Sequence, residues 1–351
     1  MEDTKNKIRV HCCGGAGVNI GDKVLSRICE LGDGFADIDI SYIDTSRSNI
    51  NTVTHNKDHF YMIKANDHSD DFIEGSGGER AKHSTAIRNS VMEYLNENKI
   101  FKPIVNEYHL VVSSASGGSG NMISAFITDL LLKRNIPVIT LLVGDSTNAL
   151  YAKNTAKSLA TLHNIAKSNK KALTIMYVNN HNYIEEHGLA KAEESANEII
   201  FNSVSTLALF LSGQNESIDA QDMANIITQT NYTSLDVKHG LYGLGVFTKN
   251  VLVQADVVYT VSRTLTVGDG IKDINIKPAY NSKAGTIISE NAINVFKNQC
   301  PIHLVAYANL FVAENKVLNK IIEDYDEMSR QIVVEDISAV GVVDEDTGIV
   351  F

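Results

Sequence analysis

The stretch Ile8–Asn19 reads IRVHCCGGAGVN, and it joins a strand-like run directly to a glycine-rich turn. The run Ile8–Cys13 predicts a buried strand, and a helix is expected after the turn. Glycines let backbone amides approach a phosphate group closely, and the N-terminus of the following helix adds a favourable dipole. This order of elements favours a phosphate-binding loop, although any tight strand-to-helix turn can also use glycine.

A second glycine-rich segment repeats this arrangement. Ser113–Asn121, with the sequence SSASGGSGN, follows the predicted strand His109–Ser114 and precedes a predicted helix from about Met122 to Lys133. A third segment, Glu74–Gly78 (EGSGG), lies between the first two in the sequence. Each segment alone could be a surface loop. Two such loops at equivalent points of one sheet can hold a polyphosphate from two sides, so the three together favour a nucleotide-binding protein.

Strand-like and helix-like stretches alternate through the first half of the chain. Such alternation predicts an α/β fold, in which helices cover both faces of a parallel sheet. Open sheets of this kind bind ligands at the carboxyl ends of their strands, where the glycine-rich segments fall. The further predicted strands are Ile38–Ile43, Pro137–Gly144 and Ala172–Asn179, and the further predicted helices are Ser84–Asn96, Ala149–Asn169 and the long Leu189–Leu211.

The pattern changes after the long helix. Strand-rich segments follow at Thr233–Gln254, Asp256–Val267 and His303–Val312, and they predict a smaller α+β domain. Glu314–Ile332 has the pattern of a charged amphipathic helix. We therefore expect a nucleotide-binding domain over residues 1–185, a central helix over 186–212, a second domain over 213–312, and a C-terminal helix with an acidic tail over 313–351.

The composition narrows the classes of protein. The chain has 351 residues and a formal net charge of −11, which argues against nonspecific binding to nucleic acid. Its 4 cysteines include no Cys-x-x-Cys pair, so we expect reduced thiols in a cytoplasmic protein and no zinc or redox site. We also expect no membrane span, because no segment is long and apolar enough, and the polar N-terminus does not resemble a signal peptide.

Two familiar nucleotide fingerprints do not fit. The sequence has no G-x-x-x-x-G-K-[ST] motif, which argues against a P-loop enzyme. GGAGVNIG does not match G-x-G-x-x-G in register, and Asp44 only comes close to the acid that ends the second strand of a Rossmann fold. An NAD-dependent oxidoreductase therefore stays a remote alternative.

The glycine-rich segments resemble those of one known family. SASGGSGN is similar to the phosphate-loop signature of the tubulin/FtsZ superfamily, and GGAGVN resembles that family's first phosphate loop. EGSGG is similar to the segment that senses the γ-phosphate, and VGDS (Val143–Ser146) falls where the family contacts the ribose. The resemblance implies a GTPase that uses GTP and GDP, with Mg²⁺ held through the phosphates and not by the protein directly. It implies nucleotide contacts from Gly14, Gly15, Ala16, Gly17, Asn19, Asp44, Gly75, Gly77, Gly78, Ser116, Gly117, Gly118, Ser119, Gly120, Asn121, Asp145 and Asn197.

The resemblance extends to a predicted catalytic loop. In the family the central helix begins with an Asn that reads guanine, and a later Asp-x-x-Asp loop inserts into the neighbouring subunit's nucleotide site. Here Asn197 precedes Asp219 by 22 residues, and Asp219 and Asp222 form the Asp-x-x-Asp pair. One carboxylate can orient and polarise the attacking water, and the other can hold the network of water and Mg²⁺. The alternative is a pair of acids that simply favours a helix N-terminus.

Some positions depart from the family's pattern. Glu193 stands where an aromatic residue often stacks on guanine, and Ser217 replaces the Asn that usually opens the catalytic loop. Asn121 and Met122 follow Gly120 where FtsZ and tubulin prefer small residues. Base stacking must then come from elsewhere or be weak, so guanine specificity stays open, with ATP as the alternative.

Within the superfamily, the motif DAQDMAN and the compact size resemble the phage tubulins. This implies a longitudinal homopolymer in the cytoplasm of an infected bacterium, which positions the phage nucleus, its DNA or capsids. A plasmid-segregation or cell-division GTPase of the same superfamily is the alternative. The acidic residues Asp344, Glu345 and Asp346 would contact the next subunit of the filament, unless the tail is a frayed, solvated terminus.

Overall fold

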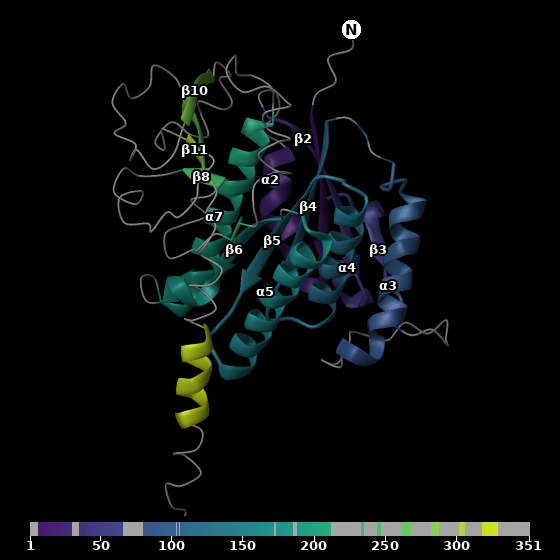
Figure 1. The fold of residues 1–351 in the computed structure, drawn as a ribbon, viewed down its shortest axis with the longest axis vertical. Helices are drawn as coiled ribbons and strands as arrows, with labels where there is room; N and C mark the ends of the chain where they lie inside the picture. Colours follow the sequence, from purple (N-terminus) through teal and green to yellow (C-terminus); the bar gives the residue numbers. More distant parts are fainter. Residues whose placement is uncertain are drawn as a thin grey trace, which may run out of the picture.

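The structure, a computed structural model, describes most of the first 211 residues and separate elements beyond them. The described ranges are 6–29, 35–65, 80–102, 104, 106–171, 173–184, 188–211, 233–234, 244–246, 262–267, 282–287, 302–305 and 318–328. Figure 1 shows the strands of a large sheet running through the molecule, with helices packed on its sides. Among the residues in these ranges, no helix is both long and apolar enough to cross a bilayer.

A seven-stranded sheet forms the centre, and every neighbouring pair of its strands is parallel. The strand order is β3-β2-β1-β4-β5-β6-β7, so the direction of winding reverses between β1 and β4. All predicted strands of the first half are present, which confirms the parallel α/β fold. The strands are β1 (Lys7–Cys13), β2 (Asp37–Asp44), β3 (Phe60–Met62), β4 (Glu107–Ser114), β5 (Val138–Gly144), β6 (Thr174–Asn179) and β7 (Thr233–Ser234).

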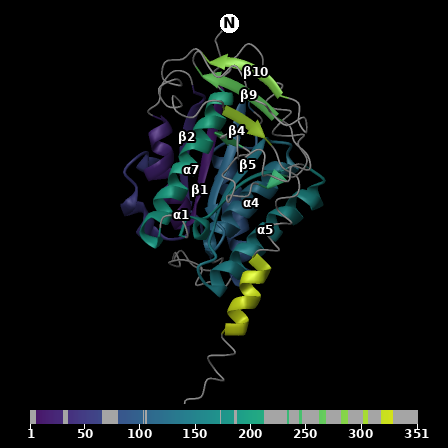
Figure 2. The same cartoon turned by 90° about the vertical axis from the view of Figure 1, so that its left-hand side faces the viewer.

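Helices cover both faces of this sheet (Figures 1 and 2). One face carries α3, α4 and α5, and the other carries α7 beside the continuous helical segment formed by α1, η1 and α2. The backbone N–H of Ala36 donates to the carbonyl of Ala208 at 2.8 Å, so α7 ends beside the amino end of β2 and begins toward the carboxyl ends. The helices are α1 (Gly14–Ile20), η1 (Gly21–Leu25), α2 (Ser26–Cys29), η2 (Arg47–Thr52), η3 (Lys57–His59), α3 (Arg80–Glu97), α4 (Ser119–Lys133), α5 (Ala149–Asn169), η4 (Asn180–Tyr183) and α7 (Leu189–Phe210).

The apolar strands explain why the sheet is covered on both sides. All seven residues of β5 (VITLLVG) are buried. A parallel strand enclosed by helices on both faces needs apolar side chains on both sides, and so it reads as a continuous apolar run. β1 departs from this rule because Arg9 and His11 alternate with the apolar Val10 and Cys12. The face of β1 that carries Arg9 and His11 therefore buries polar groups that need partners.

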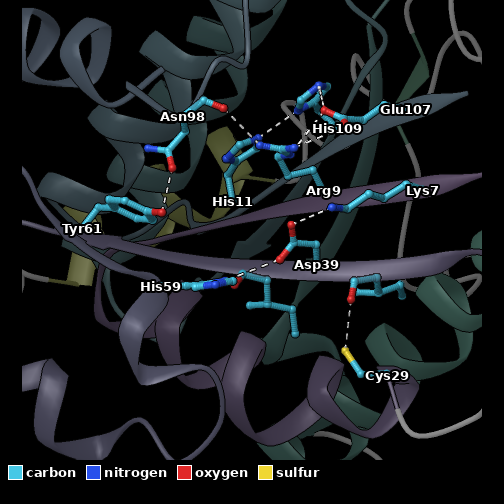
Figure 3. Close-up of polar contacts among 12 residues, drawn as sticks. Lys7, Arg9, His11, Cys29, Asp39, His59, Tyr61, Asn98, Glu107 and His109 are labelled. Atoms are coloured by element: carbon cyan, nitrogen blue, oxygen red, sulfur yellow. Dashed lines mark hydrogen bonds and ion pairs between the residues drawn. The ribbon is translucent and has the colours of Figure 1, made fainter. Parts of the chain in front are cut away.

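Those partners form a chain of buried polar side chains between β1, β4 and α3, and Figure 3 shows its members on β1 and β4. Nδ1 of His11 lies 2.8 Å from the Tyr94 hydroxyl, and Nε2 of His11 lies 3.0 Å from Nδ1 of His109. Nε2 of His109 lies 3.4 Å from a carboxylate oxygen of Glu107. The same oxygen lies 3.2 Å from Nε of Arg9, so an ion pair closes the chain.

One arrangement of protons satisfies this chain with two neutral rings. The Glu107 carboxylate can only accept, so Nε2 of His109 donates and its Nδ1 accepts. Nε2 of His11 then donates to that Nδ1, and Nδ1 of His11 accepts from the Tyr94 hydroxyl. Burial lowers the pKa of His11 well below its ordinary value, and repulsion from His109 and Arg9 adds to this effect. Burial, and after it the Arg9 charge, lowers the pKa of His109 to about 3.

A second sheet is built from the later part of the chain. Its strand order is β10-β9-β11-β8. Helix α7 contacts β8 and β11 of this sheet (Figure 1). Two points differ from the predicted pattern: β10 lies outside the predicted strand-rich segments, and β7, expected in the second domain, pairs with β6 and extends the first sheet. A two-residue strand has no periodicity, so its partner could not be predicted. The strands are β8 (Leu244–Val246), β9 (Ser262–Val267), β10 (Ser282–Ile287) and β11 (Ile302–Val305).

Candidate functional site

The segments that follow β1, β4 and β5 share one edge of the large sheet. The register pairs Cys13 with Ser113, and it pairs Ser114 with Val143. On the other side of β1, Cys13 pairs with Ile43. The turns that begin after these residues therefore lie side by side at the carboxyl edge. Because the winding reverses between β1 and β4, this edge is where an open parallel sheet leaves a crevice for a ligand.

The first two glycine-rich loops touch each other at this edge. A Cβ atom on Gly14 would lie 2.6 Å from Cα of Gly120, and a Cβ atom on Gly120 would lie 2.6 Å from the carbonyl oxygen of Cys13. Gly14 also has a φ of +71°, a conformation that side chains rarely adopt. Gly17 lies equally close to β4, since a Cβ atom there would lie 2.7 Å from the carbonyl oxygen of Val112. Larger residues at Gly14 or Gly120 would force the two loops apart, and a larger residue at Gly17 would force α1 away from β4.

Both loops direct a helix N-terminus to this edge without a side-chain cap. Cys13 precedes α1 and Gly118 precedes α4, and neither makes a capping hydrogen bond through a side chain. Neither first turn carries an acid. Elsewhere in the fold, Ser46 and Asn179 cap their short helices. Uncapped N–H groups and aligned peptide dipoles favour an anion, and the segments 13–19 and 113–121 contain no Lys or Arg that could hold one instead.

Asp44 supports the first loop indirectly. Its side chain is buried, and one carboxylate oxygen accepts from the backbone N–H of Thr45 at 2.7 Å. The other accepts from the Asn49 amide. The same amide nitrogen would lie 3.0 Å from a Cβ atom on Gly15. Asp44 therefore holds Asn49 against the first loop, and Asn49 is the side chain that lines the loop directly.

A polar ridge on α5 holds the second loop. The Asn154 amide donates to the carbonyl of Ser116 at 3.1 Å, and the Ser158 hydroxyl donates to the carbonyl of Ala115 at 2.6 Å. The Ser158 hydroxyl also accepts from the amide of Asn121, whose side chain is buried. The Asn121 side chain thus points to α5, so any contact between Asn121 and a nucleotide has to use its backbone.

The same ridge reaches the turn after β5, which contains Asp145. The backbone N–H of Asp145 donates to the Thr155 hydroxyl at 3.1 Å. One carboxylate oxygen of Asp145 accepts from the backbone N–H of Thr147 at 2.8 Å and from its hydroxyl at 2.6 Å. This side chain therefore caps its own turn. The neighbouring Ser146 is buried, and its hydroxyl accepts from the Asn179 amide at 3.3 Å. Asn179, the last residue of β6, therefore also holds this turn.

The other predicted contacts are spread along this edge and beyond it. Ala16 and Asn19 are exposed on α1, and Ser116 and Ser119 are half-buried in and after the second loop. Asn197 is half-buried and lies more than two turns inside α7, which begins at Leu189, and not at its start. Its neighbour Glu198 pairs with Arg27 of α2 at 2.8 Å. The predicted residues that lie outside the described ranges are Gly75, Gly77, Gly78, Asp219, Asp222, Asp344, Glu345 and Asp346.

Sequence reasoning missed the residues that position the loops. Asn154, Thr155 and Ser158 carry short polar side chains on the face of α5 that also buries Ala152 and Leu159. Polar residues at buried helical positions need partners, so their spacing was a usable signal. Asn49 gave no such signal, because it contacts the first loop across the fold.

A metal site built from protein side chains is not seen in the described part of the chain. There, no group of three or more His, Cys, Asp or Glu residues is placed to hold a metal ion. A cation at this edge would take its ligands from a bound phosphate, water and single side chains.

Comparisons with known proteins agree with this geometry. No family model matches the chain. Two curated proteins are similar in sequence: a phage tubulin-like protein of Pseudomonas phage phiKZ, 25% identical over 227 residues, and one of Pseudomonas phage PhiPA3, 26% identical over 229 residues. The matches cover 63% and 65% of this chain. They span 63% and 62% of the two relatives, less than two-thirds of their length.

Solved structures share the fold over nearly the whole chain. A protofilament of TubZ from bacteriophage PhiKZ superposes with a TM-score of 0.67 at 20% identity, covering 98% of this chain and 99% of that one. The phage tubulin PhuZ with GDP gives 0.66 at 20% identity, with the same coverage of both chains. An FtsZ from M. jannaschii gives 0.62 at 15% identity, covering 88% of this chain and 92% of that one.

The parallel sheet, the two touching glycine-rich loops and these neighbours define the class: the chain has the fold of the tubulin/FtsZ superfamily. Within that class it is similar in sequence to the phage tubulin-like proteins. The first statement confirms the resemblance drawn from the glycine-rich motifs, and the second confirms the resemblance to the phage tubulins drawn from DAQDMAN and the compact size.

Proposed function

We propose that this protein binds GTP, polymerises head to tail and hydrolyses GTP at the contact between successive subunits. The observation that carries the proposal is the contact between the two glycine-rich loops at Gly14 and Gly120, where two uncapped helix N-termini meet the winding reversal of the sheet. Such an edge suits a polyphosphate because backbone N–H groups can approach it from two sides.

Each part of a bound nucleotide would contact particular residues of this edge. The phosphates would lie on the N–H groups of residues 14–17 and 117–120, with hydroxyl donors from Ser116 and Ser119. The ribose would lie near Asp145, and the base would be read by Asn197, whose amide can both donate and accept. A Mg²⁺ ion bound with the nucleotide would supply charge neutralisation at the phosphates, so no Lys or Arg is required in the loops.

Hydrolysis would use Asp219 and Asp222 of the next subunit. Their carboxylates can orient a water for in-line attack, as the sequence motif IDAQDMANII suggests. Polymerisation is supported by the solved neighbours, which include a TubZ protofilament and a PhuZ filament. Guanine as the base is supported by the neighbour solved with GDP. Asp344, Glu345 and Asp346 would add a contact along the filament.

The biological role would follow from the relatives' origin. Both curated relatives come from phages, so we infer a filament in the cytoplasm of an infected bacterium that organises or positions phage DNA, capsids or the phage nucleus. The partner would be a second copy of this chain, without direct binding to nucleic acid or membrane. A plasmid-segregation or cell-division role would use the same chemistry with a different cargo.

One observation favours a second candidate. The strand order β3-β2-β1-β4-β5-β6 is also the order of dinucleotide-binding sheets, so NAD is the competing ligand for this edge. An NAD-dependent oxidoreductase would bind NAD in place of GTP, and its turnover per molecule would not require a polymer.

The experiment that separates these functions is steady-state GTP hydrolysis against protein concentration, with sedimentation in parallel. The proposal expects turnover per molecule to rise above a critical concentration, together with sedimenting polymer. Turnover per molecule that does not depend on concentration would contradict a shared site. Binding of NAD without binding of GTP would replace the proposal with the oxidoreductase.

A further inference from the structure

The turn after β5 is held by the C-terminal helix as well as by α5 and β6. This helix, residues 318–328, is drawn in yellow in Figures 1 and 2, and its first residue, Leu318, is fully buried. The Tyr325 hydroxyl donates to the carbonyl of Thr147 at 2.8 Å and lies 3.4 Å from the carbonyl of Ser146. The helix is thus tied to the backbone of the turn that contains Asp145.

A second contact ties the same helix to α5. Nζ of Lys153 lies 2.8 Å from a carboxylate oxygen of Asp326, and both side chains are nearly half exposed. An exposed ion pair stabilises little on its own. It does, however, orient the helix on the first turns of α5, next to Asn154, which holds the Ser116 carbonyl of the second loop.

These contacts join the C-terminal helix to two loops of the candidate nucleotide site. Tyr325 holds residues 146 and 147 directly. Asp326 acts through Lys153 on α5, whose ridge holds Asp145 through Thr155 and the second loop through Asn154. A displacement of the helix would therefore remove the Tyr325 hydroxyl from the Thr147 carbonyl and leave the turn held by Thr155 and Asn179.

We propose that Tyr325 is a positioning residue for the nucleotide site: its hydroxyl fixes the Asp145 turn and couples the C-terminal helix to nucleotide binding. The inference rests on the proposed function, because it deepens the account of the same site. The coupling is reciprocal, so a helix that stabilises bound nucleotide is itself stabilised by the nucleotide.

The test compares the full-length wild-type chain with Tyr325→Phe and with the matched control Tyr151→Phe. Tyr151 is exposed on the first turn of α5, so the control removes a hydroxyl near the same place. Dissociation of a fluorescent GTP analogue is measured by displacement with excess GTP. Tyr325→Phe should release it about 5-fold faster, the loss expected for one hydrogen bond, and Tyr151→Phe should match the wild type. The unfolding temperature of nucleotide-free Tyr325→Phe should fall slightly, because the variant loses one hydrogen bond of the folded state, and that of Tyr151→Phe should be unchanged.

The reciprocal measurement uses the unmodified protein. Amide hydrogen exchange of residues 318–328 is followed with and without GDP, at a concentration where no polymer sediments. Slower exchange with GDP is expected, and this experiment decides the question if Tyr325→Phe does not fold. Unchanged exchange, or equal release from Tyr325→Phe and wild type, overturns the inference alone. A wild-type chain that binds no guanine nucleotide overturns the proposed function and the inference together.

Discussion

Gly120 has no room for a side chain because the backbone of the first loop lies against it. A Cβ atom at this position would lie 2.6 Å from the carbonyl oxygen of Cys13 and 2.9 Å from Cα of Gly14. Both neighbours are backbone atoms that cannot rotate away. The spacing between the two loops is therefore set by the absence of side chains at Gly14 and Gly120. One added methyl group should displace both loops.

Replacement of Gly120 by Ala should weaken binding of a fluorescent GTP analogue by roughly 10-fold or more and lower the free energy of unfolding by about 1–3 kcal/mol. The control is Gly117→Ala in the same loop, where a Cβ atom would lie 3.8 Å from the Ser114 side chain. This control should lose less affinity than Gly120→Ala, because its methyl group meets no backbone atom and the Gly117 N–H is kept. Equal affinity for the Gly120→Ala variant and the control would show that contact between the loops does not govern binding.

The buried histidines predict a dependence of stability on pH. Their pKa values are lowered in the folded state, so between about pH 6.5 and pH 3 the unfolded chain binds protons that folded His109 does not. The folded state is thus fully favoured above about pH 6.5 and loses stability as the pH falls. The groups facing the two rings are Tyr94 of α3, Glu107 of β4 and Arg9 of β1.

The variant His109→Gln tests this dependence, because Gln can still accept from His11 and donate to Glu107 but cannot be protonated. The free energy of unfolding is measured with urea from pH 7.5 to 4.5. Its slope with pH should be smaller in His109→Gln than in the wild type, by up to about 1.4 kcal/mol per pH unit. His59→Gln is the control, since that side chain is 47% exposed. Equal slopes for His109→Gln and wild type would contradict the assignment of neutral, buried rings.

At the scale of elements, α5 connects two loops through one short row of polar side chains. Ser158 is fully buried and lies between the Ala115 carbonyl and the Asn121 amide. Its replacement by Ala would leave both groups without this partner, which costs about 1–3 kcal/mol of unfolding free energy. Ser168→Ala, at an exposed position of the same helix, should stay within about 0.5 kcal/mol of the wild type.

Urea midpoints and nucleotide affinity together decide the role of this ridge. We expect the Ser158→Ala variant to be less stable and to bind nucleotide more weakly, because the Ala115 carbonyl of the second loop loses its hydrogen bond. Loss of stability with unchanged affinity would mean that Ser158 packs the core and does not position the loop.

The elements also show what the sequence could and could not predict. Apolar runs such as Pro137–Gly144 predicted the strands, because burial between two layers of helices demands them. The π-helical turn Gly21–Leu25 was not predicted. It begins at Gly21, which packs closely against Cys12 and Tyr42, and such a tertiary contact cannot be predicted from the local sequence. The glycine-rich motifs located the edge of the sheet, but the side chains that position it come from elements far apart in the chain.

At the scale of the whole molecule, the two glycine-rich segments 13–19 and 113–121 contain no Asp or Glu that could activate a water molecule. In the proposed filament, that group comes from Asp222 of the adjoining subunit. The variant Asp222→Ala should therefore bind GTP like the wild type, hydrolyse it slowly and form filaments that persist longer. Gly120→Ala should have the opposite defect: it keeps Asp222 for its neighbour's site but binds GTP poorly itself.

Mixing these two variants tests the division of labour between subunits. Each alone should hydrolyse little GTP, but in a mixed polymer an Asp222→Ala subunit can hold the nucleotide while its Gly120→Ala neighbour supplies the carboxylate. GTP turnover in an equimolar mixture should exceed the sum of the separate variants, and it should do so only where polymer sediments. As a control, Asp222→Glu replaces Asp222→Ala in the mixture, because it keeps the negative charge of the loop and changes only the position of the carboxylate. A mixture no more active than its components, under conditions where both variants enter the polymer, would place hydrolysis within one subunit.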